Sequence, residues 1–548
     1  MNKISPLQAL SRARWALPPA LALGLAACGG GGGGGTPSFS IGGSVSGLNP
    51  GATVSLLNNG GNALKVSANG GFKFAAAIPK GGAYAVTVGA QPAGQTCSVA
   101  HATGSGVSAN VTNVAVTCSV DTYTVGGTVS GLASGQQLTL LDNGTDSLLI
   151  QANGPFQFNG PIAAGGAYAV SVGIQPSKQL CSVTNAQGSG VGANVSNVAV
   201  ACGNHYAYAV DQSTPGSVYQ YSLNGDGSLS ALSPATVATV GDIPFDMIAD
   251  PTGTHVYIAS EVPGGSRTTY GIYVGTVGAN GALTVPLYVD PNPATNPVQV
   301  LAMDYTGQYL YGTSMSTGGI YAINQFRIQS NGVPTPLATP SITPAATVTS
   351  LTADTQGPYL YAVAPLNNAV LQYDIGTGGA LSPMAAASVA AGMGPASLTV
   401  DPSGKYAYAV NYGSSTQPPS VSQYTIGSGG ALTPMLPASV PVAGGARRMA
   451  IDPSGRYAYV VGGNKAVGAV SQYTIGSNGA LTPMTPASVP AGATPVFARV
   501  DPTGSYLYVT NNANNGISAY KIGPSGLLSP VAGSPFPAGS SPQGLVVH

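Results

Sequence analysis

Residues 203–548 repeat one pattern with a period of about 50 residues. Each repeat holds a strand-like run, an Asp-x-x-Gly turn and a second strand that alternates Tyr with small apolar residues, as in KYAYAV at 405–410. A third strand, a Gly-x-Leu segment and a fourth strand complete the unit. Four strands at this period are typical of a β-propeller blade. The six complete turns begin at Asp250, Asp304, Asp354, Asp401, Asp452 and Asp501.

The two ends of this region account for a seventh blade. Third strands recur seven times, one more than the intact turns, at Tyr221, Tyr273, Tyr321, Tyr373, Tyr424, Tyr473 and Tyr520. The region begins at 205–210 with a second-strand pattern and stops at 545–548 with a first-strand pattern. The last strand is therefore predicted to complete the first blade, which would hide both free edges of the ring.

Composition agrees with an all-β protein and excludes several functions. Charged residues make up 6% of the 548 residues, with 16 basic against 16 acidic side chains, while Gly numbers 79 and Pro 44. A long helical or coiled-coil protein is excluded by this usage. No run of like charge is present, so nothing indicates a partner such as nucleic acid.

The N-terminus is read as an export signal. Residues 1–27 combine basic residues with an apolar run too short for a permanent membrane helix. They end in LAA before Cys28, which resembles the bacterial lipobox; ordinary cleavage beside an incidental Cys is the alternative. The resemblance implies lipidation of Cys28, a tether over 28–37 and, because Gly29 is not Asp, an outer-membrane lipoprotein of the bacterial cell envelope. Membrane fractionation of a Cys28→Ala variant tests this expectation.

Two copies of a smaller module follow, at 38–120 and 121–203. The segment IGGSVSGL at 41–48 returns as VGGTVSGL at 125–132, an offset of 84 residues that the cysteines share. In an exported chain this pattern predicts one disulfide per copy, between Cys97 and Cys118 and between Cys181 and Cys202. The strand-like runs suggest small β-sandwiches that resemble bacterial Ig-like modules. A spacer role and the binding of a glycan or partner both stay open.

The region 204–548 resembles a known family. Asp-Pro-x-Gly turns followed by Tyr-rich strands, with Tyr508-Val509-Thr510-Asn511 as one of them, resemble the lactonase-type seven-bladed propellers. That family includes 6-phosphogluconolactonase-like and muconate-cycloisomerase-like proteins and overlaps the YVTN-repeat proteins. The resemblance covers about 345 residues and implies a fold more strongly than an activity.

The family's reactive residues are matched only in fragments. Lactonase-type relatives carry an Arg-His pair where the first strand starts and an Asn-Glu pair where the second strand ends. Here Arg447 and Arg448 align with the first pair in one blade, so Arg448 stands where His would be. Asp246 and Glu261 align with the two places in an earlier blade. These four residues are the candidate catalytic group at a channel mouth, where carboxylates and guanidinium groups can orient water and stabilise an oxyanion; a structural salt bridge is the alternative.

Other reactive motifs are absent from the sequence. There is no Gly-x-Ser-x-Gly elbow, phosphate-binding Gly-rich loop or His-Glu-x-x-His helix, and we expect no cofactor and no metal. His101 falls in the first small module. His205, His255 and His548 cluster at the turn end of their blades and are expected at the surface, so no His supplies a base near neutral pH.

Three functions remain open. The first is a cell-envelope lipoprotein whose lactonase-like propeller binds a small molecule, a glycan or an envelope protein, with a degenerate active site. The second is a hydrolase of a lactone or other small ester, acting through Glu261 and Arg447. The third is a structural component of the envelope. The membrane anchor, through lipidated Cys28, is common to all three.

Overall fold

The structure is a computed structural model that describes residues 36–548 except 239–242, 263–268, 285, 290–297, 316–320, 444 and 464–465. Cys28 and the predicted signal segment therefore lie outside the described residues. The described chain is built of strands with two short 3₁₀ turns, η1 Pro365–Asn367 and η2 Asn512–Asn514. This confirms the all-β fold class. No helix in this described part is long and apolar enough to cross a bilayer.

Each small module is a sandwich of two four-stranded sheets. In module 1 the sheets have the orders β5-β2-β10-β8 and β4-β3-β7-β9, and module 2 repeats them as β15-β12-β20-β18 and β14-β13-β17-β19. The strands of module 1 are β1 Ser38–Phe39, β2 Ile41–Ser46, β3 Val54–Asn58, β4 Gly61–Val66, β5 Gly70–Lys73, β6 Ile78–Pro79, β7 Tyr84–Ala90, β8 Gln95–Ala100, β9 Thr103–Gly104 and β10 Val111–Val120. Those of module 2 are β11 Thr122–Tyr123, β12 Val125–Ser130, β13 Leu138–Asp142, β14 Asp146–Ile150, β15 Gly154–Gln157, β16 Ile162–Ala163, β17 Ala167–Ile174, β18 Leu180–Thr184, β19 Gln187–Ser189 and β20 Val195–Gly203.

One disulfide lies inside each module. Cys97 and Cys118 are bonded, as are Cys181 and Cys202. Each pair stands directly opposite on neighbouring antiparallel strands, β8 with β10 and β18 with β20. Both predicted pairings are confirmed.

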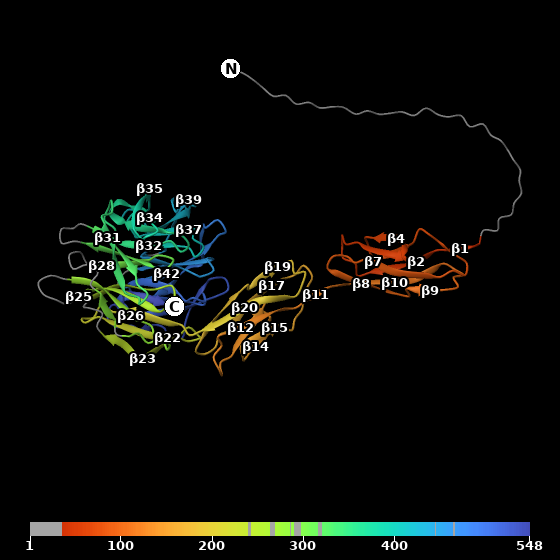
Figure 1. The fold of residues 1–548 in the computed structure, drawn as a ribbon, viewed down its shortest axis with the longest axis horizontal. Helices are drawn as coiled ribbons and strands as arrows, with labels where there is room; N and C mark the ends of the chain where they lie inside the picture. Colours follow the sequence, from red (N-terminus) through yellow and green to blue (C-terminus); the bar gives the residue numbers. More distant parts are fainter. Residues whose placement is uncertain are drawn as a thin grey trace, which may run out of the picture. The chain divides into compact units, whose positions relative to one another are not determined.

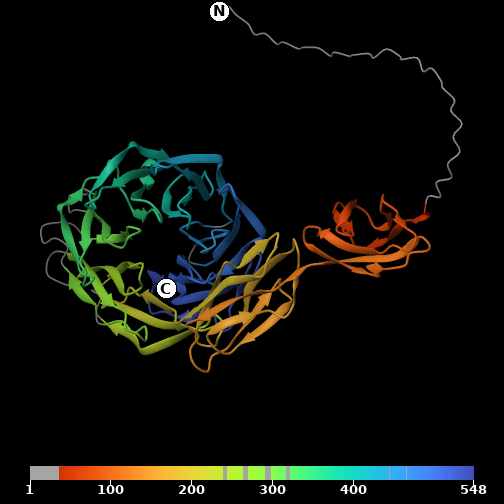
Figure 2. The same ribbon diagram turned by 45° about the vertical axis from the view of Figure 1, so that its right-hand side comes forward.

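The rest of the described chain is a ring of seven sheets (Figure 1, Figure 2). Six of them have four strands, and the seventh has a fifth strand, β48, which also pairs with β46. Their innermost strands contact one another in turn around a central axis. The strands of blades 1–3 are β21 Tyr206–Val210, β22 Ser217–Leu223, β23 Leu229–Ala238, β24 Ile243–Ala249, β25 His255–Val262, β26 Thr269–Thr276, β27 Leu287–Val289, β28 Val298–Met303, β29 Tyr309–Met315, β30 Tyr321–Ile328 and β31 Pro334–Ile342. Those of blades 4 and 5 are β32 Ser350–Ala353, β33 Tyr359–Ala364, β34 Ala369–Ile375, β35 Leu381–Ala390, β36 Pro395–Val400, β37 Tyr406–Asn411, β38 Ser420–Ile426 and β39 Leu432–Pro441. Blades 6 and 7 contain β40 Arg448–Ile451, β41 Tyr457–Gly463, β42 Gly468–Ile475, β43 Leu481–Ala491, β44 Pro495–Val500, β45 Tyr506–Asn511, β46 Gly516–Ile522, β47 Leu528–Pro530 and β48 Phe536–Pro537.

The C-terminal strand completes blade 1. The strand β49, Leu545–Val547, pairs antiparallel with β21, and Ala207 lies opposite Val547. The first blade is thus built from both ends of the repeat region, as its sequence pattern predicts. This arrangement joins residues more than 300 positions apart into one sheet, because a ring without it would leave a strand edge unpaired.

The third strands show one difference from the sequence alignment. In blade 4 the recurring aromatic residue Tyr373 lies opposite Leu360, and in blade 3 the residue opposite Leu310 is Phe326. Tyr321, which the sequence alignment puts in this position, lies five residues earlier on β30. The alignment was wrong here because it required Tyr where the blade needs only an aromatic ring.

Every blade is joined to the next by the same hydrogen bond. A tyrosine hydroxyl from the second strand donates to the carbonyl of a glycine in the turn between the third and fourth strands of the following blade, at 2.5–3.0 Å. The pairs are Tyr208–Gly281, Tyr257–Gly332, Tyr311–Gly379, Tyr361–Gly430, Tyr408–Gly479, Tyr459–Gly526 and Tyr508–Gly227. The last pair links blade 7 to blade 1. The repeated tyrosines are therefore structural, which agrees with their reading as blade packing.

Module 2 and the propeller form one compact unit, 122–548, separate from the unit that contains module 1. Leu180 is fully buried and packs in one hydrophobic cluster with Leu223 of blade 1 and Tyr506 of blade 7. The amide of Gly225, in a turn of blade 1, donates to the carbonyl of Ser177 at 3.2 Å. Module 2 is thus fixed to the propeller by apolar packing and a backbone hydrogen bond.

Candidate functional site

Two ends of the propeller axis must be distinguished. The Asp-x-x-Gly turns lie at one end, which we call the turn end, and the starts of the innermost strands lie at the other, the loop end. Glu261, close to the end of β25, pairs with Ile243 at the start of β24. Arg448 begins β40, and Arg447 directly precedes it. Asp246 lies within β24.

Asp246 is held by the backbone of two blades. Its side chain is 3% exposed, and its two oxygens accept hydrogen bonds from the amides of Met247 and of Leu301 in blade 3, both at 3.0 Å. Burial raises the pKa of this carboxyl, and the charges of Arg448 and Arg499 oppose that rise. Asp246 therefore interacts electrostatically with two arginines, although the described residues include no direct ion pair between them.

Arg448 and Arg499 share an aromatic partner. The guanidinium carbon of Arg448 lies 4.2 Å from the centre of the Phe497 ring, and that of Arg499 lies 5.9 Å from it. Both arginines are half-buried. Burial lowers the pKa of each, and for Arg499 the charge of Arg448 adds to this effect.

Arg499 was missed in the sequence. The signal was present: Arg448 precedes its turn Asp by four residues and Arg499 by two, and side chains two apart on a strand share a face. The motif comparison considered only the start of the strand, so it did not reach this position.

The other two predicted residues stand apart. The guanidinium of Arg447 lies 5.9 Å from the ring centre of Tyr412 in blade 5, and its buried Nε has no hydrogen-bond partner among the described residues. No ion pair joins Glu261 to either Arg447 or Arg448 in the described part of the chain. The structure thus groups Asp246 with Arg448, and it does not bring Glu261 and Arg447 into contact. Their catalytic role stays a prediction.

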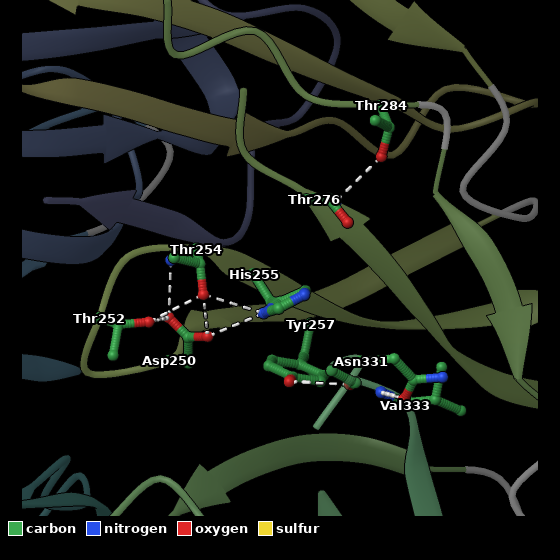
Figure 3. A network of polar contacts seen from close by, with 10 residues as sticks. Asp250, Thr252, Thr254, His255, Tyr257, Thr276, Thr284, Asn331 and Val333 are labelled. Atoms are coloured by element: carbon green, nitrogen blue, oxygen red, sulfur yellow. Dashed lines mark hydrogen bonds and ion pairs between the residues drawn. The ribbon is translucent and has the colours of Figure 1, made fainter. Parts of the chain in front are cut away.

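The histidines expected at the surface are packing residues. The Nδ1 of His255 lies 3.0 Å from Oδ2 of Asp250, and the same carboxylate accepts hydrogen bonds from Thr252 and Thr254 (Figure 3). His255 fills the place that a tyrosine has in other blades, against Gly332 of blade 3. The ring of His548 stacks on Tyr208, with 5.5 Å between ring centres. The prediction of surface histidines was wrong in part, because His205, His255 and His548 are half-buried against neighbouring strands and blades.

We expect the propeller to lose stability as the pH falls from 7.5 to 5, and to lose less in a His548→Phe variant. Burial lowers the pKa of His548 from 6.5, and the nearby His205 adds to this effect while Asp250 opposes it. Below pH 6.5 the unfolded chain therefore binds more protons than the folded chain. The contribution of neutral His548 to the free energy of unfolding is complete above pH 6.5 and is lost as the pH falls below that value. The Phe variant keeps a ring on Tyr208 but takes up no proton.

Urea unfolding of both proteins across this pH range measures the difference. Burial also raises the pKa of Asp246 and Asp501, whose effect on stability has the opposite sign. That effect is common to both proteins and cancels when the two pH profiles are subtracted. Parallel profiles would contradict the assignment to His548.

Among the described residues, no group of three or more His, Cys, Asp or Glu side chains is arranged to hold a metal ion. Asp246, Arg448 and Arg499 form one interacting charged group on the innermost strands of the propeller. Together they carry more positive than negative charge, which favours an acidic or strongly polar ligand.

Comparison with known proteins supports the fold. The family model described as Lactonase, 7-bladed beta-propeller, matches residues 309–444 and 417–543. No curated protein matches the sequence. A candidate 6-phosphogluconolactonase from Bacteroides fragilis and the periplasmic gluconolactonase of Pseudomonas aeruginosa each share 18% identity with a TM-score of 0.52, and the match covers 63% of this chain and 98% and 99% of theirs. Likeness at this identity concerns the fold. Residues 204–548 therefore form a seven-bladed β-propeller of the lactonase type.

Proposed function

We propose that the propeller binds a small molecule at its axis and does not hydrolyse it. The observation that carries this proposal is the burial and hydrogen bonding of the Asp246 side chain. Both of its oxygens accept backbone amides and its side chain is 3% exposed, so it has little access to a water molecule that it would have to activate. A binding site needs no such access, and the two arginines near this carboxylate are suited to hold a polar ligand.

Hydrolysis of a lactone is the second candidate. It is favoured by Glu261, which lies near the loop end of β25 where the family resemblance puts a reactive Glu. Against it, no described residue brings a guanidinium to Glu261 as an ion pair. A lactonase needs a base and an oxyanion stabiliser that act on the same ester, and no ion pair among the described residues links Glu261 to Arg447. The cell-envelope location and the lipid anchor belong to this proposal as sequence-based expectations.

The test uses the full chain with a panel of aliphatic and sugar lactones and their open acids. Each compound is assayed for turnover and for a shift in the melting temperature. We expect at least one compound to raise the melting temperature, since a ligand that binds only the folded state stabilises it, and we expect no saturable turnover.

The matched variants are Glu261→Gln and Asp246→Asn, assayed beside the parent chain. Turnover that is lost in Glu261→Gln would establish the hydrolase and overturn the binding proposal. Neither turnover nor a thermal shift with any compound would also overturn it, in favour of a structural component.

A further inference from the structure

A cavity of about 360 Å³ lies at the turn end of the propeller axis. It is lined by the innermost strands of blades 7, 1, 2 and 3, or by residues directly after them. Its walls include the apolar side chains of Ile248, Met303 and Val546, and its polar groups are Arg499, His548 and Asp250. The lining is polar and apolar in nearly equal measure, and the polar groups converge on one concave site, as they do in many small-molecule sites.

Arg499 brings an incompletely paired guanidinium to this cavity. Among the described residues its side chain makes one hydrogen bond, from Nη1 to the carbonyl of Ala498 at 3.2 Å. A guanidinium has five N–H donors, and no remaining donor of Arg499 is among the buried polar atoms without a partner, so these donors are open to a ligand that enters the cavity. The unused donors of Arg499 form the fork that matches the two oxygens of a carboxylate.

His548 contributes its ring to the cavity wall. Its ring is fixed between Tyr208, on which it stacks, and Gly253, where an added Cβ would lie 2.6 Å from Nδ1. The opposite ring nitrogen, Nε2, is buried and has no hydrogen-bond partner among the described residues. Because Nε2 has almost no accessible surface, a ligand in the cavity meets the ring of His548 as a wall and not this nitrogen.

Asp250 limits the charge of what can enter. The carboxylate of Asp250 is already hydrogen-bonded to Thr252, Thr254 and His255, so its oxygens are not available to a ligand (Figure 3). Burial acts to raise the pKa of Asp250, but the hydrogen bonds from His255, Thr254 and Thr252 together outweigh it and lower the pKa, so this carboxyl stays ionised. Arg499 lies beside the carboxylate of Asp250 at this cavity and also interacts with Arg448 and Asp246. This near balance of charge favours a ligand with a single negative charge over a phosphate dianion.

We propose that this cavity binds a small monocarboxylic acid with a compact apolar body. The carboxylate accepts hydrogen bonds from the guanidinium of Arg499, and the body packs against Ile248, Met303, Val546 and the ring of His548. The inference rests on the proposed binding function, for which it names the ligand class and the position. It goes beyond the resemblance to lactonases, whose reactive residues align with the opposite end of the axis.

Calorimetric titration of the full chain tests this site, with phenylacetate as the acid and phenylacetamide as its uncharged counterpart. We expect saturable binding of the acid and at least tenfold weaker binding of the amide. Arg499→Gln should weaken binding of the acid at least tenfold. Arg327→Gln, which removes the same charge from an exposed position on β30, should leave it unchanged.

Met303→Ala provides a second variant, which removes part of the apolar wall of the cavity, and it should also weaken binding of phenylacetate. Thermal melts identify any variant that fails to fold. Equal affinity for the acid and the amide, unchanged affinity in both variants, or no binding of phenylacetate would overturn the inference. A ligand from the lactone panel that still shifts the melting temperature equally in Arg499→Gln would leave the binding function in place and remove only this site.

Discussion

Replacing Gly430 with alanine destabilises the propeller by about 2–5 kcal/mol, which combines about 1–2 kcal/mol for the left-handed backbone with about 1–3 kcal/mol for overpacking. Gly430 is a turn residue of blade 5 with φ of +77°. A Cβ added there would collide with the ring of Tyr359 in blade 4. The displaced ring would also disturb the neighbouring hydrogen bond from the Tyr361 hydroxyl to the Gly430 carbonyl, which is 2.7 Å long.

The preceding glycine offers a matched control. An added Cβ on Gly429 has no atom within 4 Å, and this residue is exposed. Gly429→Ala is therefore expected to change the stability by less than about 0.5 kcal/mol. Urea unfolding of the two variants beside the parent chain measures both values. Equal stability of the two variants would show that the contact between blades does not depend on this glycine.

Replacing Leu180 with threonine is the second change with a large expected effect. Leu180 is fully buried between module 2 and the propeller. Loss of a buried leucine costs about 2–5 kcal/mol, and the new hydroxyl would need a partner in an apolar cluster. We expect earlier unfolding of the propeller and a larger radius of gyration, because module 2 would no longer be held against blades 1 and 7.

Module 1 supplies the control for this change. Thr96 is the equivalent residue by the offset of 84, and it is exposed, with its hydroxyl donating to Asp121 at 2.7 Å. Thr96→Ala should leave both the unfolding midpoint and the small-angle scattering profile nearly unchanged. If Leu180→Thr behaves in the same way, the packing of Leu180 does not hold module 2 in place.

The sequence shows both of these positions, but in each case only the structure shows which residues they contact. Glycines that recur once per blade are visible in the sequence as a pattern, and the structure supplies the ring that each one contacts. The exchange of Thr96 for Leu180 is also visible, as an apolar residue at a position that is polar in the first copy. The structural role of Leu180 could not be predicted, because the sequence predicts two equivalent spacers and contains no sign of what Leu180 packs against.

The candidate site was predicted in part. Asp246 and Arg448 were found by their alignment with first-strand positions, and the structure places both in one charged group at the axis. Arg499 and His548 were not singled out as a site. Arg499 falls outside the motif, and His548 was expected at the surface. Their approach depends on closure of the ring, which brings blade 7 beside the strand that completes blade 1.

The sequence by itself determined the all-β class, the seven blades, the closing strand and the two disulfides. These features depend on residues that are close together in the chain or that repeat with one period. Local turn and strand preferences are enough to define them. Only the tertiary structure decided that module 2 is part of the propeller unit and that Arg499 and His548 face one cavity. Those contacts join side chains that are distant in sequence, and their geometry follows from how blades pack around the axis, which no local pattern records.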